Sequence, residues 1–381
     1  MNTYDVVIVG GGIIGGSIAF ELARGNMRVI VLDRQELMHE ASWAAAGMLS
    51  PAPDSPAAIP LVPLARASLA LYPGFIDAIE DRSAINTGYQ TEGALEVLCH
   101  GDAERELSTL VALHRGLGLA CDPLRLEEAR EMEPALGREA RAAAFLPGEE
   151  SVNPRSLSAA LLDASSIAGV ELRPAANVVS LIKDKKRCTG VKTLAGDVFS
   201  AGHVVVAAGC WTSQLSEIAP YAPTRPVRGQ MVALRNAGVP LRRVLRSERG
   251  YIVPRDHETP QNLVAGSTIE NAGYEKAVTS GGLEQILGAV NGLAPSLAGA
   301  EIADTWSGLR PGTPDQLPIL GPTDVEGLLI ATGHYRNGIL LAPITAELIA
   351  AWITDGRTAL NCEDFSPLRF LGGSADRSAQ A

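Results

Sequence analysis

A glycine-rich turn between two short apolar runs constrains the fold of this chain more than any other feature. The runs are Val6–Val9 and Val29–Leu32, and both are rich in β-branched residues, which suits strands buried on both faces of a sheet. The segment Gly10–Gly15 follows the first run in the pattern Gly-x-Gly-x-x-Gly, and a helical pattern then continues to Arg24. This order predicts a βαβ unit of a parallel sheet.

Each glycine of this turn has a separate role in binding a dinucleotide. Gly10 allows the tight turn, Gly12 lets the backbone approach a pyrophosphate, and Gly15 lets the helix pack closely on the strand. The helix N-terminus adds free N–H groups and a partial positive charge. Asp33 ends the second strand, where its carboxylate can accept hydrogen bonds from a ribose. Strand, turn, helix and acid together predict a dinucleotide site, although the glycine pattern alone would be weak support.

Length and charge exclude several classes of protein. A chain of 381 residues is longer than one core usually supports, so two domains are expected. The 32 Lys and Arg against 43 Asp and Glu give a net charge of −11, which argues against nucleic acid or an anionic membrane as a partner. No uncharged apolar stretch reaches the roughly 18 residues of a spanning helix, and no basic segment precedes the first strand. We therefore expect a cytoplasmic protein that needs no membrane.

The cysteines do not form a recognisable framework. They are odd in number and contain no Cys-x-x-Cys pair, so neither structural disulfides nor a metal site is expected. The five are Cys99, Cys121, Cys188, Cys210 and Cys362.

The spacing of apolar residues predicts the remaining elements. Helices are expected over 64–79, 103–117, 153–168, 283–293 and 339–353. Strands are expected over 92–98, 170–173, 178–182, 188–193, 204–208, 229–234, 244–247, 251–254, 263–267 and 327–332. The Pro-rich stretch 51–63 is expected to be a loop, and the small, polar tail 369–381 to be disordered.

These varied spacings favour an α/β fold in which a Rossmann-like dinucleotide domain is interrupted twice by a domain built on an antiparallel sheet. The first domain is expected to comprise 1–85, 151–222 and 302–368, and the second 86–150 and 223–301.

Three further segments favour a flavin over a nicotinamide. Val204–Trp211 is a buried strand that opens onto small residues, against which a flavin can lie. Trp306–Asp315 contains Gly-Leu-Arg-Pro-Gly-Thr-Pro-Asp, and Gly333–Ile339 contains His-Tyr-Arg-Asn-Gly ahead of the last helix. The N-terminus of that helix can stabilise negative charge on a reduced flavin.

Together with the fingerprint and the run Ser42–Met48, these motifs resemble those of the glycine oxidases, within the FAD-dependent D-amino acid oxidase superfamily. The resemblance covers about residues 4–365 in the same order and spacing. It implies the D-amino acid oxidase or glutathione reductase-like fold, with FAD in the first domain. It also implies oxidation of glycine, sarcosine or small D-amino acids to the imino acid, which water converts to a 2-oxo acid and an amine. Reoxidation by O₂ would give H₂O₂, commonly for thiamine thiazole synthesis, in a homotetramer.

The resemblance also implies which residues bind the cofactor and the substrate. Arg310, Arg336 and Tyr251 would bind the substrate. The FAD contacts would be Gly10, Gly12, Ile13, Ile14, Gly15, Asp33, Arg34, Ala41, Ser42, Ala46, Gly47, Met48, Val178, Ala208, Gly209, His334, Tyr335, Arg336, Asn337, Gly338, Ile339 and Leu340.

The chemistry of the proposed substrate residues agrees with these roles. A substrate carboxylate in a dry pocket must be paired, and Arg310 can bind it through two hydrogen bonds. The hydroxyl of Tyr251 can donate to the same carboxylate. Hydride then leaves the α-carbon once the amine is neutral, so positioning supplies most of the catalysis and no acid or base is required at that carbon.

Two departures from neighbouring families bear on the site. Monomeric sarcosine oxidases attach FAD through a cysteine in the segment that corresponds to 307–320, and none is present here, which predicts non-covalent FAD. Arg249 lies two residues before Tyr251, hence on the same face of an expected strand. If that face lines the pocket, Arg249 would favour a second anionic group on the substrate.

Two other functions remain open at this point. A D-amino acid dehydrogenase of the same superfamily would pass electrons to a quinone or carrier instead of O₂. A non-catalytic FAD-binding subunit would keep the fingerprint but lose the substrate residues.

Overall fold

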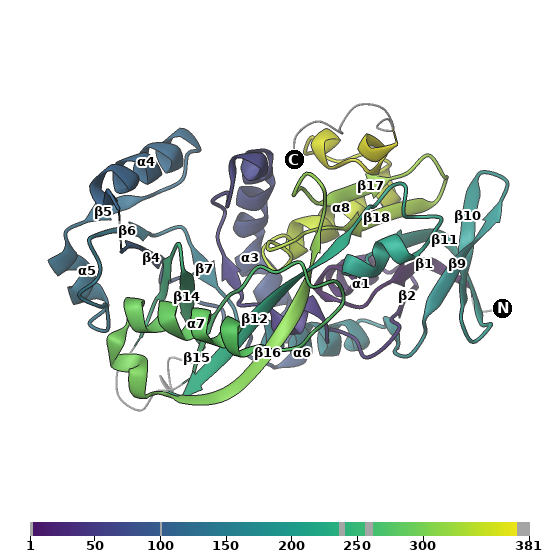
Figure 1. The fold of residues 1–381 in the computed structure, drawn as a ribbon. Helices are drawn as coiled ribbons and strands as arrows, with labels where there is room; N and C mark the ends of the chain where they lie inside the picture. Colours follow the sequence, from purple (N-terminus) through teal and green to yellow (C-terminus); the bar gives the residue numbers. More distant parts are fainter. Residues whose placement is uncertain (1–2, 100, 236–240, 256–261, 372–381) are drawn as a thin grey trace.

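A computed structural model describes residues 3–99, 101–235, 241–255 and 262–371, and the statements below concern this part of the chain. Two large sheets lie side by side (Figure 1). Strands of the dinucleotide unit occupy the right half of the view, and the second sheet occupies the left half.

The first sheet has eight described strands around the βαβ unit. Its path runs β17–β18–β11–β1–β2–β8; the strands from β18 to β8 are parallel, and the β9–β10 hairpin extends from β11. The bounds are β1 Thr3–Val9, β2 Val29–Leu32, β8 Glu171–Arg173, β9 Val178–Asp184, β10 Arg187–Thr193, β11 Val198–Val206, β17 Ile319–Pro322 and β18 Leu328–Thr332.

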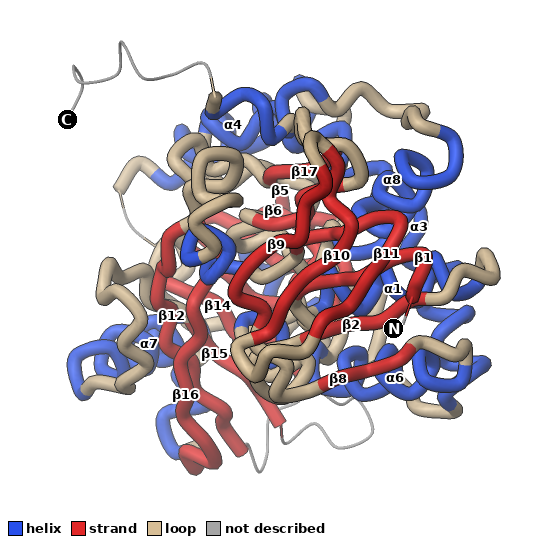
Figure 2. The backbone as a smooth tube through the Cα atoms, turned by 90° about the vertical axis from the view of Figure 1, so that its right-hand side faces the viewer, coloured by secondary structure: helices blue, strands red, loops and turns tan. Residues whose placement is uncertain are grey.

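Helices α1 and α8 pack on this sheet, and α3 and α6 pack against these two helices; together the four enclose the largest core (Figure 2). These four helices are α1 Ile13–Arg24, α3 Val62–Ser83, α6 Pro154–Ile167 and α8 Ala342–Asp355. The other described helices are α2 Ala41–Ala44, α4 Ala103–Gly116, α5 Leu126–Met132 and α7 Ser280–Leu293, with 3-10 turns η1 Pro56–Leu61, η2 Gly209–Gln214, η3 Pro295–Gly299, η4 Glu363–Phe365 and η5 Pro367–Phe370.

The second sheet also has eight described strands, in the order β16–β12–β15–β14–β13–β4–β6–β5, and all neighbours are antiparallel except β13 and β4. Helix α7 packs on its central strands. The bounds are β4 Ala94–Leu98, β5 Asp122–Leu124, β6 Ala142–Leu146, β12 Arg225–Arg235, β13 Val244–Ser247, β14 Gly250–Pro254, β15 Asn262–Gly266 and β16 Glu301–Gly312; β3 Met48–Leu49 and β7 Glu150–Ser151 form a separate pair.

The architecture confirms the predicted fold class, but the strand β16 was missed. Gly308, Pro311 and Gly312 are poor strand formers, yet they lie within a twelve-residue strand paired along β12. This strand belongs to the second sheet, so the expected boundary at residue 302 places 302–312 with the wrong sheet. The sequence also missed β6, which is rich in alanine.

Three other local predictions were wrong. The stretch 51–63 is not all loop, because η1 begins at Pro56 and α3 at Val62; proline is tolerated in a first helical turn. The last helix begins at Ala342, after a turn in which Leu341 N donates to Asn337 O. The start of the tail is ordered, since Arg369 donates to Asp315 at 2.8 Å. Residues 372–381 of the tail lie outside the described residues.

One described helical segment, Pro56–Ser83, is long and apolar enough to cross a membrane by length and composition alone. Its buried side chains belong to the main core, where Tyr72 donates its hydroxyl proton to Ile339 O at 2.6 Å. These contacts attach the segment to the main core.

The glycine turn after β1 depends on very close backbone contacts. Gly10 has a φ of +106°, and a Cβ there would lie 2.5 Å from Ala207 O. A Cβ at Gly15 would lie only 2.0 Å from Gly10 O. Gly15 therefore holds α1 against the turn, which is the role expected from the sequence.

Replacing Gly15 by alanine should force α1 away from the turn and weaken both folding and cofactor retention. We expect Gly15→Ala to lose about 2 kcal/mol or more of unfolding free energy, measured by urea denaturation, and to purify with less flavin. Gly74→Ala is the matched control, because Gly74 also lies within a helix and a Cβ there meets nothing within 4 Å. The control should be neutral or slightly stabilising. Equal losses in both variants would contradict this account.

Candidate functional site

A cavity of about 380 Å³ lies where the four sequence motifs meet. It extends from the turn after β1 to β14 and β16 of the second sheet. Its lining includes Gly10, Gly12, Ile13, Ile14, Asp33, Arg34, Ala41, Ser42, Ala46, Gly47, Met48, Val178, Ala208, Gly209, Tyr251, Arg310, His334, Tyr335, Arg336, Gly338 and Ile339. Three of the predicted cofactor residues, Gly15, Asn337 and Leu340, are not in this lining.

The N-terminus of α1 forms one end of the cavity. The buried hydroxyl of Ser42 accepts a hydrogen bond from the Ile13 N–H at 2.8 Å. This amide is therefore not free, although the sequence had predicted free N–H groups at the start of the helix. The amides of Gly12 and Ile14 make no hydrogen bond to any part of the chain that the structure describes. Unpaired N–H groups at a helix N-terminus attract phosphate. This end therefore fits the pyrophosphate of a dinucleotide.

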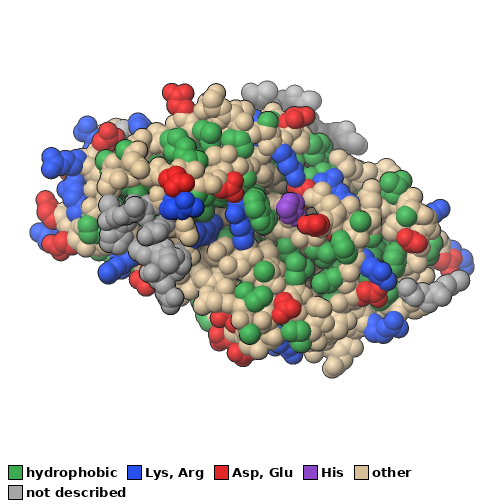
Figure 3. All heavy atoms as spheres, turned by 90° about the horizontal axis from the view of Figure 1, so that it is seen from below, with side chains coloured by type: hydrophobic (Ala, Val, Ile, Leu, Met, Phe, Trp, Pro, Cys, Tyr) green, Lys and Arg blue, Asp and Glu red, His purple; other side chains and the backbone are tan. Residues whose placement is uncertain are grey.

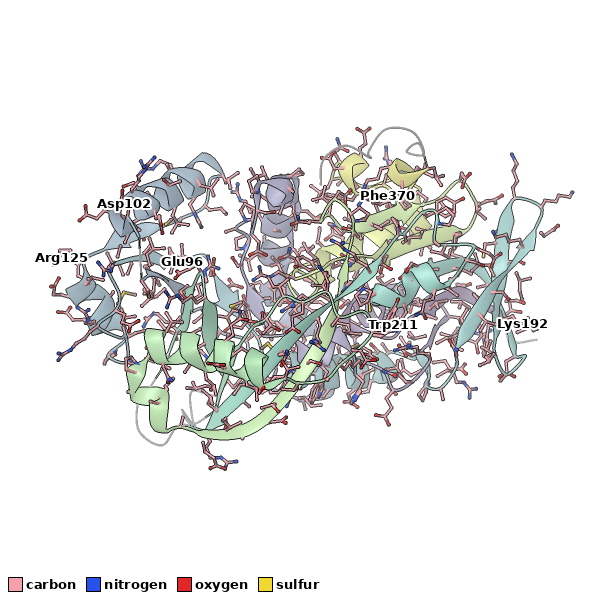
Figure 4. All side chains as sticks on the ribbon, viewed as in Figure 1. Glu96, Asp102, Arg125, Lys192, Trp211 and Phe370 are labelled. Atoms are coloured by element: carbon pink, nitrogen blue, oxygen red, sulfur yellow. The ribbon has the colours of Figure 1, made fainter. Side chains whose placement is uncertain are left out.

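Asp33 and Arg34 lie next to this end. The Asp33 carboxylate accepts the N–H of Gly11 at 2.7 Å and that of Gln35 at 3.0 Å, and burial raises its pKa above the ordinary value. The Arg34 guanidinium lies 3.8 Å from the centroid of the Trp211 ring and 3.0 Å from the Glu40 carboxylate. Trp211 lies on η2 between the two halves of the molecule (Figure 4). The sequence did not place Trp211 in the site, although it ends one of the quoted motifs.

The small residues at the end of α2 and just after it are held against the second sheet by hydrogen bonds to their backbone carbonyl groups. Trp306 Nε1 donates to Ala44 O at 3.1 Å, and Arg255 Nη2 donates to Ala45 O at 3.4 Å. A Cβ at Gly308 would lie 2.5 Å from the Ala44 Cβ, so the Gly308 position allows this close approach. The run thus forms a fixed wall of the cavity rather than a mobile loop.

Arg310 is a half-buried cation that no carboxylate neutralises within the described residues. Its Nη1 donates to Thr268 O at 3.1 Å and its Nη2 to Ser267 Oγ at 2.7 Å. A Cβ at Gly229 would lie only 2.2 Å from Nη1. The lack of a side chain at Gly229 therefore leaves room for the guanidinium to lie over β12. Burial lowers the pKa of Arg310, Tyr251 raises it, and the Arg336 charge lowers it. Such a cation is suited to bind an anion from the cavity.

Tyr251 belongs to a row of residues opposite one another across the second sheet. Its hydroxyl reaches over β15 to Met231 Sδ at 3.5 Å. The contact is possible because residue 266 is a glycine and has no Cβ. A Cβ at this position would lie 2.9 Å from that hydroxyl and 2.5 Å from Met231 Sδ. In order of pairing, the row is Trp306, Met231, Gly266, Tyr251, Arg246 and Glu96.

Arg336 is less buried than Arg310 and already has a partner. Its Nη1 lies 3.2 Å from Asp54 Oδ2, in the Pro-rich segment where the sequence offered no sign of a site residue. Tyr335 adopts a left-handed φ of +48° and donates its N–H to Pro311 O at 3.1 Å. This contact places Arg336 next to the segment that carries Arg310.

His334 lines the cavity as a neutral side chain. Burial lowers its pKa to about 3, and Nε2 lies 3.1 Å from Thr345 Oγ1 in α8. With one ring nitrogen bound in this way, His334 joins the cavity wall to the last helix.

The hypothesis that Arg249 lines the pocket was wrong. Its side chain is exposed and lies 3.6 Å from Glu248, because residues 248–249 form the turn between β13 and β14. The strand alternation therefore does not extend to Arg249. On the other side of Tyr251, Arg255 is the arginine turned inward, where Nη1 donates to Val152 O at 3.0 Å.

Comparison with known proteins identifies the family. A family model described as DAO, FAD dependent oxidoreductase, matches residues 5–352. The chain belongs to the DAO family of FAD dependent oxidoreductases. A glycine oxidase of Geobacillus kaustophilus is 36% identical over 97% of this chain and 98% of its own length. A crystal structure of glycine oxidase from the same organism superimposes with a TM-score of 0.91, at 35% identity over 97% of this chain and 99% of the other.

A third relative, a bifunctional protein ThiO/ThiG of Trichormus variabilis, is 36% identical, and the match spans 97% of this chain but 55% of that protein. These likenesses establish this DAO-family chain as an FAD-dependent amino acid oxidase with the predicted fold. Its cofactor is FAD, and the unpaired amides at α1 fit the FAD pyrophosphate.

The cavity wall contains a cysteine that is unsuited to covalent attachment. Burial raises the pKa of Cys210 to about 12, so its thiol stays protonated at neutral pH and is a weak nucleophile. We expect acid precipitation to release all of the flavin into the supernatant as FAD, measured by absorbance, in both the wild type and Cys210→Ser. A yellow pellet in the wild type would contradict this prediction.

Adding a methyl group at Gly266 should displace Tyr251 and Met231 without disturbing the rest of the sheet. We expect Gly266→Ala to raise KM for the amino acid on the order of tenfold, because the Tyr251 hydroxyl shifts relative to Arg310. Gly288→Ala in α7 is the control, since a Cβ there meets nothing within 4 Å. Steady-state kinetics test this pair, and an unchanged KM in Gly266→Ala would refute the role assigned to Tyr251.

Proposed function

We propose that this oxidase acts on glycine and related small amines, including sarcosine and small D-amino acids. The products would be a 2-oxo acid, ammonia or an amine, and H₂O₂. The observation that carries the proposal is Arg310, a half-buried guanidinium in the cavity wall that has Tyr251 beside it and no carboxylate partner among the described residues. A small amino acid supplies the missing negative charge.

Arg310 and Tyr251 would fix the substrate by its acid end. The guanidinium has donors beyond the two used by Ser267 and Thr268, and they can bind a carboxylate in the cavity. The Tyr251 hydroxyl can add a third hydrogen bond. Fixing the carboxylate limits the positions that the α-carbon can take in the cavity. The hydride acceptor for that carbon would be supplied by FAD bound in the same cavity.

The cavity wall provides little that could act as a base. Asp33 is held by two backbone amides, and Glu40 accepts hydrogen bonds from Arg34. His334 is neutral and bound to Thr345. The catalytic contribution of the described residues is therefore positioning and exclusion of water, with the amine reacting in its neutral form.

A dehydrogenase that passes electrons to a quinone remains the alternative within the same family. The full-length match to glycine oxidases supports O₂ as the acceptor. The match to bifunctional ThiO/ThiG proteins supports a role in thiamine thiazole synthesis. A homotetrameric assembly rests on the family resemblance.

Glycine should bleach the oxidised flavin under anaerobic conditions, and admission of air should restore the colour with one H₂O₂ per flavin. Arg310→Met should lower kcat/KM about 10²–10³-fold, because the substrate carboxylate would be buried without a partner. Arg249→Met, which removes an exposed arginine in the turn before β14, is the matched control and should retain activity. A flavin that stays oxidised with glycine, sarcosine and D-alanine would overturn the proposal, and bleaching without H₂O₂ would favour the dehydrogenase.

A further inference from the structure

Two guanidinium groups lie in the same part of the cavity wall, and within the described residues only one has a carboxylate partner. Arg336 lies 3.2 Å from Asp54, whereas Arg310 pairs with no carboxylate in the described parts of the chain. The two cations are close enough for the Arg336 charge to lower the pKa of Arg310. Together, the three side chains carry a net charge of +1.

Asp54 is held near Arg336 by a segment that is anchored at both ends. At one end, the Ser50 hydroxyl donates to Glu149 at 2.6 Å and accepts from Arg246 at 3.1 Å. At the other end, Ser55 Oγ donates to Gln316 Oε1 at 3.1 Å. Proline residues between these anchors restrict the backbone further.

Arg246 gives the first anchor its rigidity. It is buried between Glu149 and Glu96, with Nη1 2.9 Å from the Glu149 carboxylate. Arg246 also lies directly opposite Tyr251 in the sheet. Figure 4 shows Glu96 in the second-sheet half of the molecule, where this cluster begins. The segment carrying Asp54 is therefore fixed to the same strand pair that positions Tyr251.

We propose that Asp54 is a specificity-determining residue that restricts this site to substrates with a single negative charge. By neutralising Arg336, it leaves Arg310 as the cation that binds the substrate carboxylate. A ligand with a second anionic group would have to displace Asp54 from Arg336 or approach it as a like charge. The proposal deepens the proposed function, because it requires that Arg310 bind a carboxylate.

The charge balance gives the expected size of the effect. A like charge a few ångströms away in a partly exposed site lowers affinity by a factor on the order of ten. Removing the Asp54 charge should also free the Arg336 guanidinium to bind the second anionic group. Both effects act mainly on the second anionic group, so they favour dianions over monoanions.

Titration of the FAD-loaded enzyme with glycolate and with tartronate (hydroxymalonate) tests the proposal. Tartronate is glycolate with one additional carboxylate. Perturbation of the flavin absorbance reports binding without turnover. We expect the wild type to prefer glycolate and Asp54→Asn to shift the affinity ratio toward tartronate on the order of tenfold.

Three further variants separate a charge effect from a structural one. Asp54→Glu keeps the charge and should retain the wild-type ratio. Adding Arg336→Gln to Asp54→Asn should abolish the gain in tartronate affinity. Asp304→Asn is the matched control, because Asp304 is also half-exposed and pairs with an arginine, Arg155, at 3.8 Å. It should leave the ratio unchanged.

The outcomes distinguish this proposal from the proposed function. If glycolate binds but Asp54→Asn changes both affinities equally, Asp54 only supports the segment and the inference fails alone. If glycolate does not perturb the flavin of the wild type, carboxylate binding at Arg310 fails and the inference fails with it.

Discussion

The site depends on one guanidinium that is withdrawn from solvent and has no counter-ion among the described residues. Arg310 is held over β12 because Gly229 leaves room for it, and its hydrogen bonds to Ser267 and Thr268 fix its direction. A buried charge without a partner destabilises the protein, so its retention at a cavity wall indicates a ligand that supplies the opposite charge. The remaining wall is largely apolar or already paired. The surface in Figure 3, by contrast, carries scattered charges of both signs with no dominant basic patch on that face.

The second sheet joins the substrate residues to the cofactor domain through very close contacts. Gly266 allows Tyr251 to reach Met231, and Gly308 allows Ala44 to pack on β16. Strands β12 and β16 of the second sheet extend toward the first sheet (Figure 1). The row containing Tyr251 ends on β16 at Trp306, whose Nε1 donates a hydrogen bond to Ala44 O. The position of the substrate relative to the flavin is thus set by rigid strands rather than by mobile loops.

The sequence predicted most of the fold and much of the candidate site. The βαβ unit was accessible because its signal is local, with strand, turn, helix and acid within 33 residues of the N-terminus. Strand β16 was not, because its pairing with β12 overrides the weak strand preference of its glycines and proline. Arg249 was wrongly assigned to the pocket because the alternation of side chains along a strand was extended back from Tyr251 into a turn. Asp54 gave no signal, since its proximity to Arg336 arises only when segments almost 300 residues apart meet.

A structure of the enzyme with FAD and glycolate bound would test the central claim most directly. We expect the glycolate carboxylate to lie within hydrogen-bond distance of the Arg310 guanidinium and the Tyr251 hydroxyl, with the α-carbon of glycolate facing the flavin. A glycolate bound elsewhere in the cavity, with Arg310 unliganded, would contradict this claim.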